Sequence, residues 1–319
     1  MTKPKLSIVI PMREGVQESW LQELLKVQGE VEFILVYPPS VPFMAIADSR
    51  LRQIASPLRG EVIQRVTALL NAAGKYVLSV NCDEYLHPHI IAIAEDYFST
   101  YPDSYFFRLK QAMFPFGDAP IDKPWGSLRS FKDINVRKRN AEKAYSEAEK
   151  DQTMREIPIT PLDNRVDWLA LFRGRRDHNG PHQENFDKKV WKNELVQEAL
   201  TGVVPTFTLF GPFKYVPFWT ADRLMGLSVQ SRFFEPGKIA GHWLPLPEQL
   251  RTEDNPPNHP RKNRRYVLAE MSILRQFPGY GYLWNLVVLD RGNIFMVWFP
   301  KDTIKNLAER LGLRKPKTE

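Results

Sequence analysis

A polar, acidic cluster, Asn81-Cys82-Asp83-Glu84, directly follows an apolar run at residues 76–80. The run is short and is preceded by Gly74, a pattern typical of a buried strand that is entered from the end of a helix. In an open α/β sheet, ligands bind outside the carboxyl ends of the strands. The carboxylate and amide side chains of this cluster are therefore predicted to face a substrate crevice.

The elements that must position this cluster form a regular series. Short β-branched runs predict buried parallel strands, and the apolar spacing between them predicts helices. The strands are at residues 6–11, 31–37, 76–80 and 104–109, and the helices are at residues 17–27, 61–73 and from Pro88 onward. Alternation of strands and helices is the signature of βαβ units. Residues 1–110 are therefore predicted to be a nucleotide-binding-like α/β half.

Beyond residue 110 the pattern loosens. Residues 111–250 are predicted to be the second half of the same domain, with a charged helical insertion near residues 129–156. Residues 251–319 are predicted to be a C-terminal extension that contains helices. The expected fold class is α/β, a Rossmann-like mixed sheet flanked by helices and followed by a helical extension.

The composition limits the classes of function. Of the 319 residues, 43% are hydrophobic and 25% are charged, as in a soluble globular protein. The single cysteine, Cys82, excludes an intrachain disulfide and a multi-cysteine zinc site, and it fits a reducing compartment. The apolar runs are too short to span a membrane. We expect a cytoplasmic protein, either fully soluble or peripheral at a membrane.

The net charge of +7 has two interpretations. It favours polyanionic partners such as nucleotide diphosphates or an anionic membrane, or it serves solubility alone. Nucleic acid is not an expected partner, because the basic runs are separated and are not interleaved with an ordered aromatic pattern.

Four features follow one another in a fixed order. They are the strand that ends in Pro11, Arg65, the segment Ala72-x-Gly74-x-Tyr76, and Asn81-x-Asp83-Glu84 after the next strand. Together they resemble the family 2 glycosyltransferases of GT-A fold, over roughly the first hundred residues. The resemblance implies transfer of a sugar, with inversion, from a nucleotide sugar such as a UDP-sugar. The acceptor would be a carbohydrate or a lipid-linked glycan, in polysaccharide biosynthesis.

The resemblance also implies a metal-assisted donor site. Pro11, Arg65, Asn81 and Asp83 would bind the donor, and Mn²⁺ or Mg²⁺ would neutralise the leaving diphosphate as a Lewis acid. The Asp83 carboxylate and the Asn81 amide oxygen suit such hard cations. His242, between glycine and tryptophan, stands at about the distance where the family often has a metal-binding histidine. Asn81 replaces the first aspartate of the family's Asp-x-Asp motif, so one carboxylate remains.

The general base of the family precedes or begins a helix, and two residues compete for this role. Asp222, in Trp219-Thr220-Ala221-Asp222, resembles the tryptophan-containing loop that leads into the family's acid. Glu194, in Asn193-Glu194-Leu195, resembles the same motif in a different alignment. Asp222 is slightly favoured, and both remain candidates.

Two departures from the family favour an alternative, a catalytically inactive glycan- or nucleotide-binding protein of the same fold. One is Asn81. The other is residues 36–40, Val36-Tyr37-Pro38-Pro39-Ser40, where the family has Val-Asp-Asp-Gly-Ser with an aspartate that contacts the nucleobase. Tyr37 either stacks on a base in its place or belongs to the core.

Overall fold

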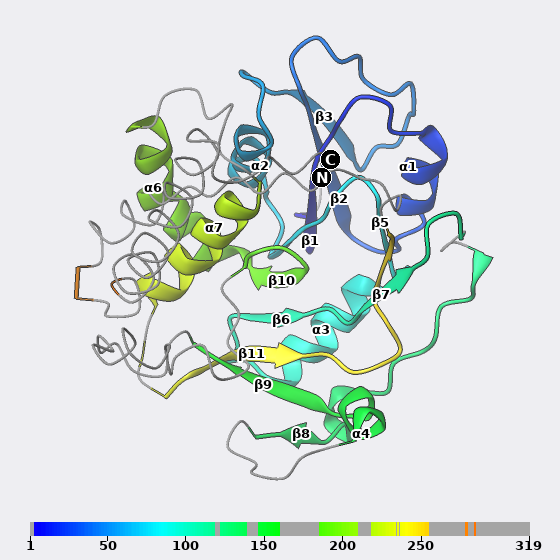
Figure 1. The fold of residues 1–319 in the computed structure, drawn as a ribbon, viewed down its shortest axis with the longest axis vertical. Coiled ribbons are helices and arrows are strands. Elements are labelled where there is room, and N and C mark those ends of the chain that lie inside the picture. The colour runs from blue at the N-terminus through cyan, green and yellow to red at the C-terminus, as the bar shows by residue number, and fades with distance from the viewer. Residues whose placement is uncertain are drawn as a thin grey trace, which may run out of the picture.

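The structure is a computed structural model that describes residues 3–118, 122–138, 146–159, 185–209, 218–233, 235, 237–254, 278, 279 and 284. These residues form a mixed α/β fold around a nine-stranded sheet, with a smaller three-stranded sheet beside it (Figure 1). The strand order of the large sheet is β3-β2-β1-β4-β10-β6-β11-β9-β8.

The first four strands of the large sheet are parallel. They are β1 (Leu6–Pro11), β2 (Val31–Tyr37), β3 (Leu51–Ala55) and β4 (Tyr76–Ser79). Every residue of β1, β2 and β4 is buried, as expected for parallel strands that are covered on both faces. The predicted strands at residues 6–11, 31–37 and 76–80 are confirmed. Strand β3 was not predicted, because its half-exposed sequence LRQIA lacks a continuous apolar run.

Helices cover both faces of the sheet. The helices are α1 (Glu18–Leu24), α2 (Glu61–Leu70), α3 (Ile90–Thr100), α6 (Asn193–Leu209) and α7 (Phe218–Arg232). Successive strand residues point to opposite faces, so Val9 packs in one core cluster with Val62 of α2, whereas Ile8 packs in the other with Trp20 of α1. The sheet therefore lies between a layer of α2, α6 and α7 and a layer of α1 and α3 (Figure 1).

One strand of the large sheet runs against its neighbours on both sides. Strand β10 (Lys189–Lys192) lies antiparallel between β4 and β6 (Phe106–Arg108). It therefore begins at the carboxyl edge of β4 and ends at the amino edge. Beyond β6, strand β11 (Ile239–Trp243) continues parallel to β6, and β9 (Met154–Pro158) and β8 (Val136–Arg137) complete the sheet.

The small sheet holds the end of the polar cluster, because Glu84 is the first residue of one of its strands. It consists of β5 (Glu84–Leu86), β12 (Leu250–Glu253) and β7 (Gln111–Phe114). Because β5 begins directly after Asp83, the turn that carries Asn81 and Asp83 is held between strands of two different sheets.

The segment near residues 129–156 is helical only in part. It contains a 3₁₀ turn at Phe131–Asp133 and the helix α4 (Glu147–Gln152), which begins with a capping box between Ser146 and Glu149. It also contributes β8 and part of β9 to the edge of the large sheet. Most of the predicted extension at residues 251–319 lies outside the described residues.

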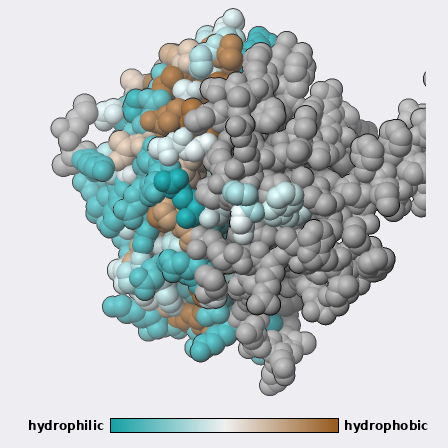
Figure 2. Space-filling model, turned by 90° about the vertical axis from the view of Figure 1, so that its left-hand side faces the viewer, coloured by the Kyte–Doolittle hydropathy of each residue, from teal (hydrophilic) through white to brown (hydrophobic). Residues whose placement is uncertain are grey.

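The visible surface mixes polar and apolar side chains. Over the described part of the face in Figure 2, hydrophobic residues form small groups among hydrophilic ones. Among the described residues, the structure has no helix that is long and apolar enough to cross a membrane.

Candidate functional site

A cavity of about 280 Å³ opens at the carboxyl ends of β1 and β4. Strand β1 ends at Pro11, and β4 leads into the turn with Asn81 and Asp83, so two parallel strands deliver both segments to one edge. The lining residues are Pro11, Met12, Arg13, Glu61, Gln64, Asn81, Cys82 and Asp83. The structure thus brings together Pro11, Asn81 and Asp83 of the predicted donor site.

Arg65 lies beneath this cavity and is not part of its lining. Its buried side chain donates from Nη2 to Asn81 Oδ1 at 2.5 Å and to Glu61 Oε1 at 3.1 Å, and from Nη1 to Ser79 Oγ. These bonds fasten the turn after β4 to helix α2. The resemblance implied that Arg65 faces the diphosphate, whereas in the structure it holds Asn81 in place.

Arg13 was not predicted to belong to the site. It follows Pro11 by two residues, where the chain leaves β1, and its Nη2 lies 3.2 Å from Asp83 Oδ2. Both side chains reach solvent, with 66% of Arg13 and 42% of Asp83 exposed. The signal that could have found Arg13 is its position just past a strand end, which is the signal that identified Asp83.

Gln64 closes one side of the cavity. Its Nε2 donates to the carbonyl oxygens of Met12 at 2.7 Å and Val36 at 2.6 Å, so one buried side chain joins the ends of β1 and β2. Tyr37 is also buried, and its hydroxyl donates to Gln53 Oε1 at 2.7 Å. Of the two interpretations of Tyr37, the structure supports the core residue.

Glu84 ties the polar turn to the start of β10. Its carboxylate accepts from the backbone N–H of Asn81 at 2.8 Å and lies 3.4 Å from Lys188 Nζ. The backbone N–H of Lys188 in turn donates to Ser79 O at 3.3 Å. Burial raises the pKa of Glu84, and the charge of Lys188 opposes this rise.

Asp222 of α7 meets the segment that precedes β10. Its Oδ1 accepts from the backbone N–H groups of Phe186 at 2.8 Å and Asp187 at 2.6 Å. Burial, together with the neighbouring Asp187 carboxylate, raises the pKa of Asp222 to about 7. A carboxyl group with a pKa near neutrality can take up a proton during a reaction at neutral pH, which is the property of a general base.

The Asp187–Asp222 pair belongs to the same edge as the cavity. Burial raises the pKa of Glu61 and Glu84, and the charge of Asp187 adds to this rise. Burial lowers the pKa of Arg108, and the charges of Asp187 and Asp222 oppose this. The sequence alone assigned no role to Asp187. Asp187 precedes β10, and β10 runs antiparallel to β4. Asp187 therefore lies at the carboxyl edge of β4, which could be recognised only once the direction of β10 was known.

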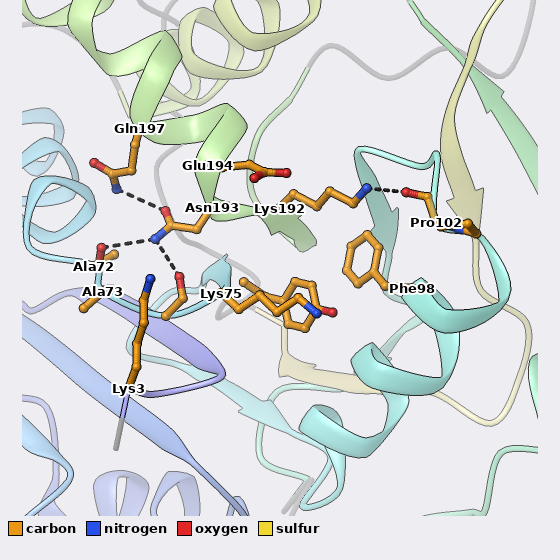
Figure 3. Close-up of a pocket in the computed structure, with 12 residues that line it drawn as sticks. Lys3, Ala72, Ala73, Lys75, Phe98, Pro102, Lys192, Asn193, Glu194 and Gln197 are labelled. Carbon is orange, nitrogen blue, oxygen red and sulfur yellow. Dashed lines mark hydrogen bonds between the residues drawn. The ribbon is translucent and has the colours of Figure 1, made fainter. Parts of the chain in front are cut away.

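Glu194 lies at the opposite edge. It lies two residues after the end of β10 and lines a cavity of about 770 Å³ at the amino end of β4 (Figure 3). Next to it, the Asn193 side chain donates to Ala72 O at 3.1 Å and to Gly74 O at 2.8 Å. The structure therefore separates Glu194 from Asp83 and places Asp222 on the side of the cavity.

Comparison with known proteins agrees with this architecture. No family model and no curated protein matches the sequence. Among solved structures, a crystal structure of S. aureus TarS is similar with a TM-score of 0.50 at 12% identity, over 92% of this chain and 44% of that one. The chain has a glycosyltransferase-like fold.

Two further TarS structures, of residues 1–349, were matched at lower scores. The complex with UDP-GlcNAc has a TM-score of 0.49 at 13% identity, over 92% of this chain and 73% of that one. The complex with UDP has a TM-score of 0.48 at 13% identity, over 98% and 75%.

In this glycosyltransferase-like fold, His242 does not approach Asp83. It lies on β11, opposite Phe107 of β6 in the register, and the strand order β4-β10-β6-β11 sets it three strand spacings, roughly 14 Å, from β4. Its Nδ1 is 2.7 Å from the hydroxyl of Tyr97, and burial lowers the pKa of His242 to about 4. The structure therefore does not bring His242 and Asp83 together, and burial favours the neutral form of His242.

The oxygen donors at the cavity already have cationic partners. Among the described residues, no group of three or more His, Cys, Asp or Glu side chains could hold a metal ion. Asn81 Oδ1 accepts from Arg65, and Asp83 is paired with Arg13. One oxygen of each side chain therefore already has a guanidinium partner.

Proposed function

We propose that this protein is a glycosyltransferase of the family 2 type that moves a sugar from a nucleotide diphosphate, with a UDP-sugar as the expected donor, to a carbohydrate or lipid-linked acceptor. One observation carries the proposal. Asp222, a buried acid with a pKa near 7, lies at the same sheet edge as the cavity formed by Pro11, Arg13, Asn81 and Asp83. A base and an anion-binding cavity at the carboxyl edge are the two parts that such a transfer needs.

The residues take the following roles in this proposal. Asp222 accepts the proton of the acceptor hydroxyl, whose oxygen forms a bond to the anomeric carbon while the bond from that carbon to the diphosphate breaks. The bonding electrons leave with the diphosphate. Because attack and departure occur on opposite faces, the configuration inverts. Asp187 keeps Asp222 in place through its backbone N–H and raises its pKa through its charge.

The composition supports a cellular location for the proposed activity. A single cysteine and a net charge of +7 support a cytoplasmic protein that makes peripheral contact with an anionic membrane, where a lipid-linked acceptor would be presented.

A glycan- or nucleotide-binding protein without activity is the second candidate, and it rests on Asn81, which is held by Arg65 and adds no carboxylate to the site. Release of UDP from UDP-sugars, with water or a glycan as acceptor, distinguishes the two. UDP-GlcNAc, the ligand of one TarS complex, is a suitable first donor. Turnover that is lost in Asp222→Asn and kept in Glu194→Gln supports the enzyme. UDP binding without turnover of any donor supports the binding protein.

A further inference from the structure

We propose that Arg13, and not a divalent cation, neutralises the diphosphate of the donor, and that Asp83 orients Arg13 instead of binding a metal ion. This inference rests on the proposed function, since it concerns how the same cavity takes the same class of ligand. It assigns to Asp83 a positioning role.

The position of Arg13 suits a phosphate ligand. Arg13 lies two residues after the end of β1 and lines the cavity. Its backbone N–H donates to the sulfur of Cys82, and its side chain contacts Asp83. A guanidinium carries five N–H donors in a planar fork, and the contact with Asp83 Oδ2 uses one nitrogen, Nη2. The exposed remainder of the fork can bind two phosphate oxygens at once while Asp83 keeps its orientation.

The surroundings of Asn81 disfavour a cation. A metal ion bound to an amide oxygen lies about 2.0–2.6 Å from it. Because Arg65 Nη2 is 2.5 Å from Asn81 Oδ1, such an ion would lie within about 5 Å of a guanidinium nitrogen. Like charges at this separation repel strongly in a partly buried site. A cation on Asp83 Oδ2 would compete with Arg13, which lies 3.2 Å from that oxygen.

The charges of the cavity are balanced before any ligand binds. Glu61 and Asp83 carry negative charges in its lining, and Arg13 in the lining and Arg65 beneath it carry positive ones. A diphosphate that approaches Arg13 therefore meets the most exposed positive charge of the site, while Arg65 remains paired with Glu61 beneath the cavity. When the bond to the sugar breaks, the electron pair goes to the diphosphate oxygen, and Arg13 stabilises that charge through hydrogen bonds.

The test measures UDP binding by calorimetry and donor turnover, each in EDTA and with added Mn²⁺ or Mg²⁺. We expect UDP to bind in EDTA with a Kd that changes less than about threefold on addition of metal. Arg13→Ala should weaken UDP binding about 10- to 100-fold, the usual effect of losing a hydrogen bond to a charged group, and Arg13→Lys should fall between. Arg52→Ala, which removes an exposed arginine on β3 that is bonded to Asn71, is the matched control and should bind normally.

The second part of the experiment measures UDP binding by variants of Asp83. If Asp83 orients Arg13, Asp83→Asn should weaken UDP binding less than Arg13→Ala does, and the double variant should be no worse than Arg13→Ala alone. UDP binding that is absent in EDTA and restored by Mn²⁺, and that Asp83→Asn abolishes while Arg13→Ala does not, overturns the inference but leaves the proposed function in place. Absence of UDP binding in every condition, in a protein that unfolds cooperatively, overturns both.

Discussion

The two edges of the large sheet differ in the size of their cavities and in the side chains that they gather. The amino edge has the larger cavity, about 770 Å³, lined by Lys3, Lys75, Lys192 and Glu194, among others. The carboxyl edge has a cavity of about 280 Å³, but it gathers the Arg13–Asp83 pair, the buried Glu84 and the Asp187–Asp222 pair. Among the described residues, the carboxyl groups with a raised pKa are Glu61, which lines this cavity, and Glu84 and Asp222 at the same edge.

The amino edge is a structural junction. Asn193 joins the start of α6 to the segment before β4, and a Cβ atom on Gly74 would lie 2.6 Å from the backbone nitrogen of Ser7. In the proposed function, cavity size does not locate the site. Strand direction does, because parallel strands deliver the loops that follow them to one edge.

Exchange of one acid at each edge tests the comparison most directly. Asp222→Asn keeps an oxygen that can accept from Phe186 and Asp187, but it removes the base, so turnover should fall about 100- to 10,000-fold. Glu194→Gln, at the amino edge, should leave turnover within about twofold, since a general base acts only within reach of the acceptor proton. The rate of UDP release from a UDP-sugar measures the turnover of each variant. Equal losses in the two variants would contradict the distinction between the edges.

The pH dependence follows from the raised pKa of Asp222. Turnover should fall about tenfold per pH unit below a pH of about 7, as the base becomes protonated, and this acidic limb should be missing from the residual rate of Asp222→Asn.

Stability should change with pH in the opposite direction to turnover. The folded state binds a proton that the unfolded chain has already lost, so the stability from this group is present at low pH and is lost as the pH rises through about 7. Urea unfolding of the parent and of Asp222→Asn at pH 5.5 and 8 measures this change in the free energy of unfolding.

Asn193→Ala should affect stability and not catalysis. It leaves the buried carbonyl oxygens of Ala72 and Gly74 without this donor, which should lower the free energy of unfolding by about 1–3 kcal/mol. Denaturant titration measures the loss, and turnover of the folded variant should equal that of the parent. A variant of normal stability with impaired turnover would mean that the amino edge takes part in the reaction.

Tyr97→Phe should produce a smaller loss in the core. It removes the hydroxyl that contacts His242, Ser104 and the carbonyl of Phe106, and it should destabilise the fold by about 1 kcal/mol. Thermal unfolding with and without Mn²⁺ measures this change. A parent protein that Mn²⁺ stabilises, with the effect lost in Tyr97→Phe, would return His242 to the metal ligands.

The sequence by itself determined where the main strands lie and which edge of the sheet carries Asp83. Continuous apolar runs can be recognised without any partner, so β1, β2 and β4 were predicted, whereas the half-exposed β3 was not. The position of Asp83 after a strand end depends only on local order along the chain, and it was predicted correctly from that order.

The tertiary structure alone decided which groups meet. Asp222 and Glu194 could be distinguished only through the antiparallel direction of β10, which pairing with β4 and β6 imposes and which the four residues of the strand do not encode. The contacts of Arg13 with Asp83 and of Arg65 with Asn81 join residues 70 and 16 positions apart. His242 stands at the sequence distance expected of a metal-binding histidine, but its strand β11 is separated from β4 by β10 and β6. Contacts of this kind arise from the packing of distant segments, so sequence spacing does not reveal them.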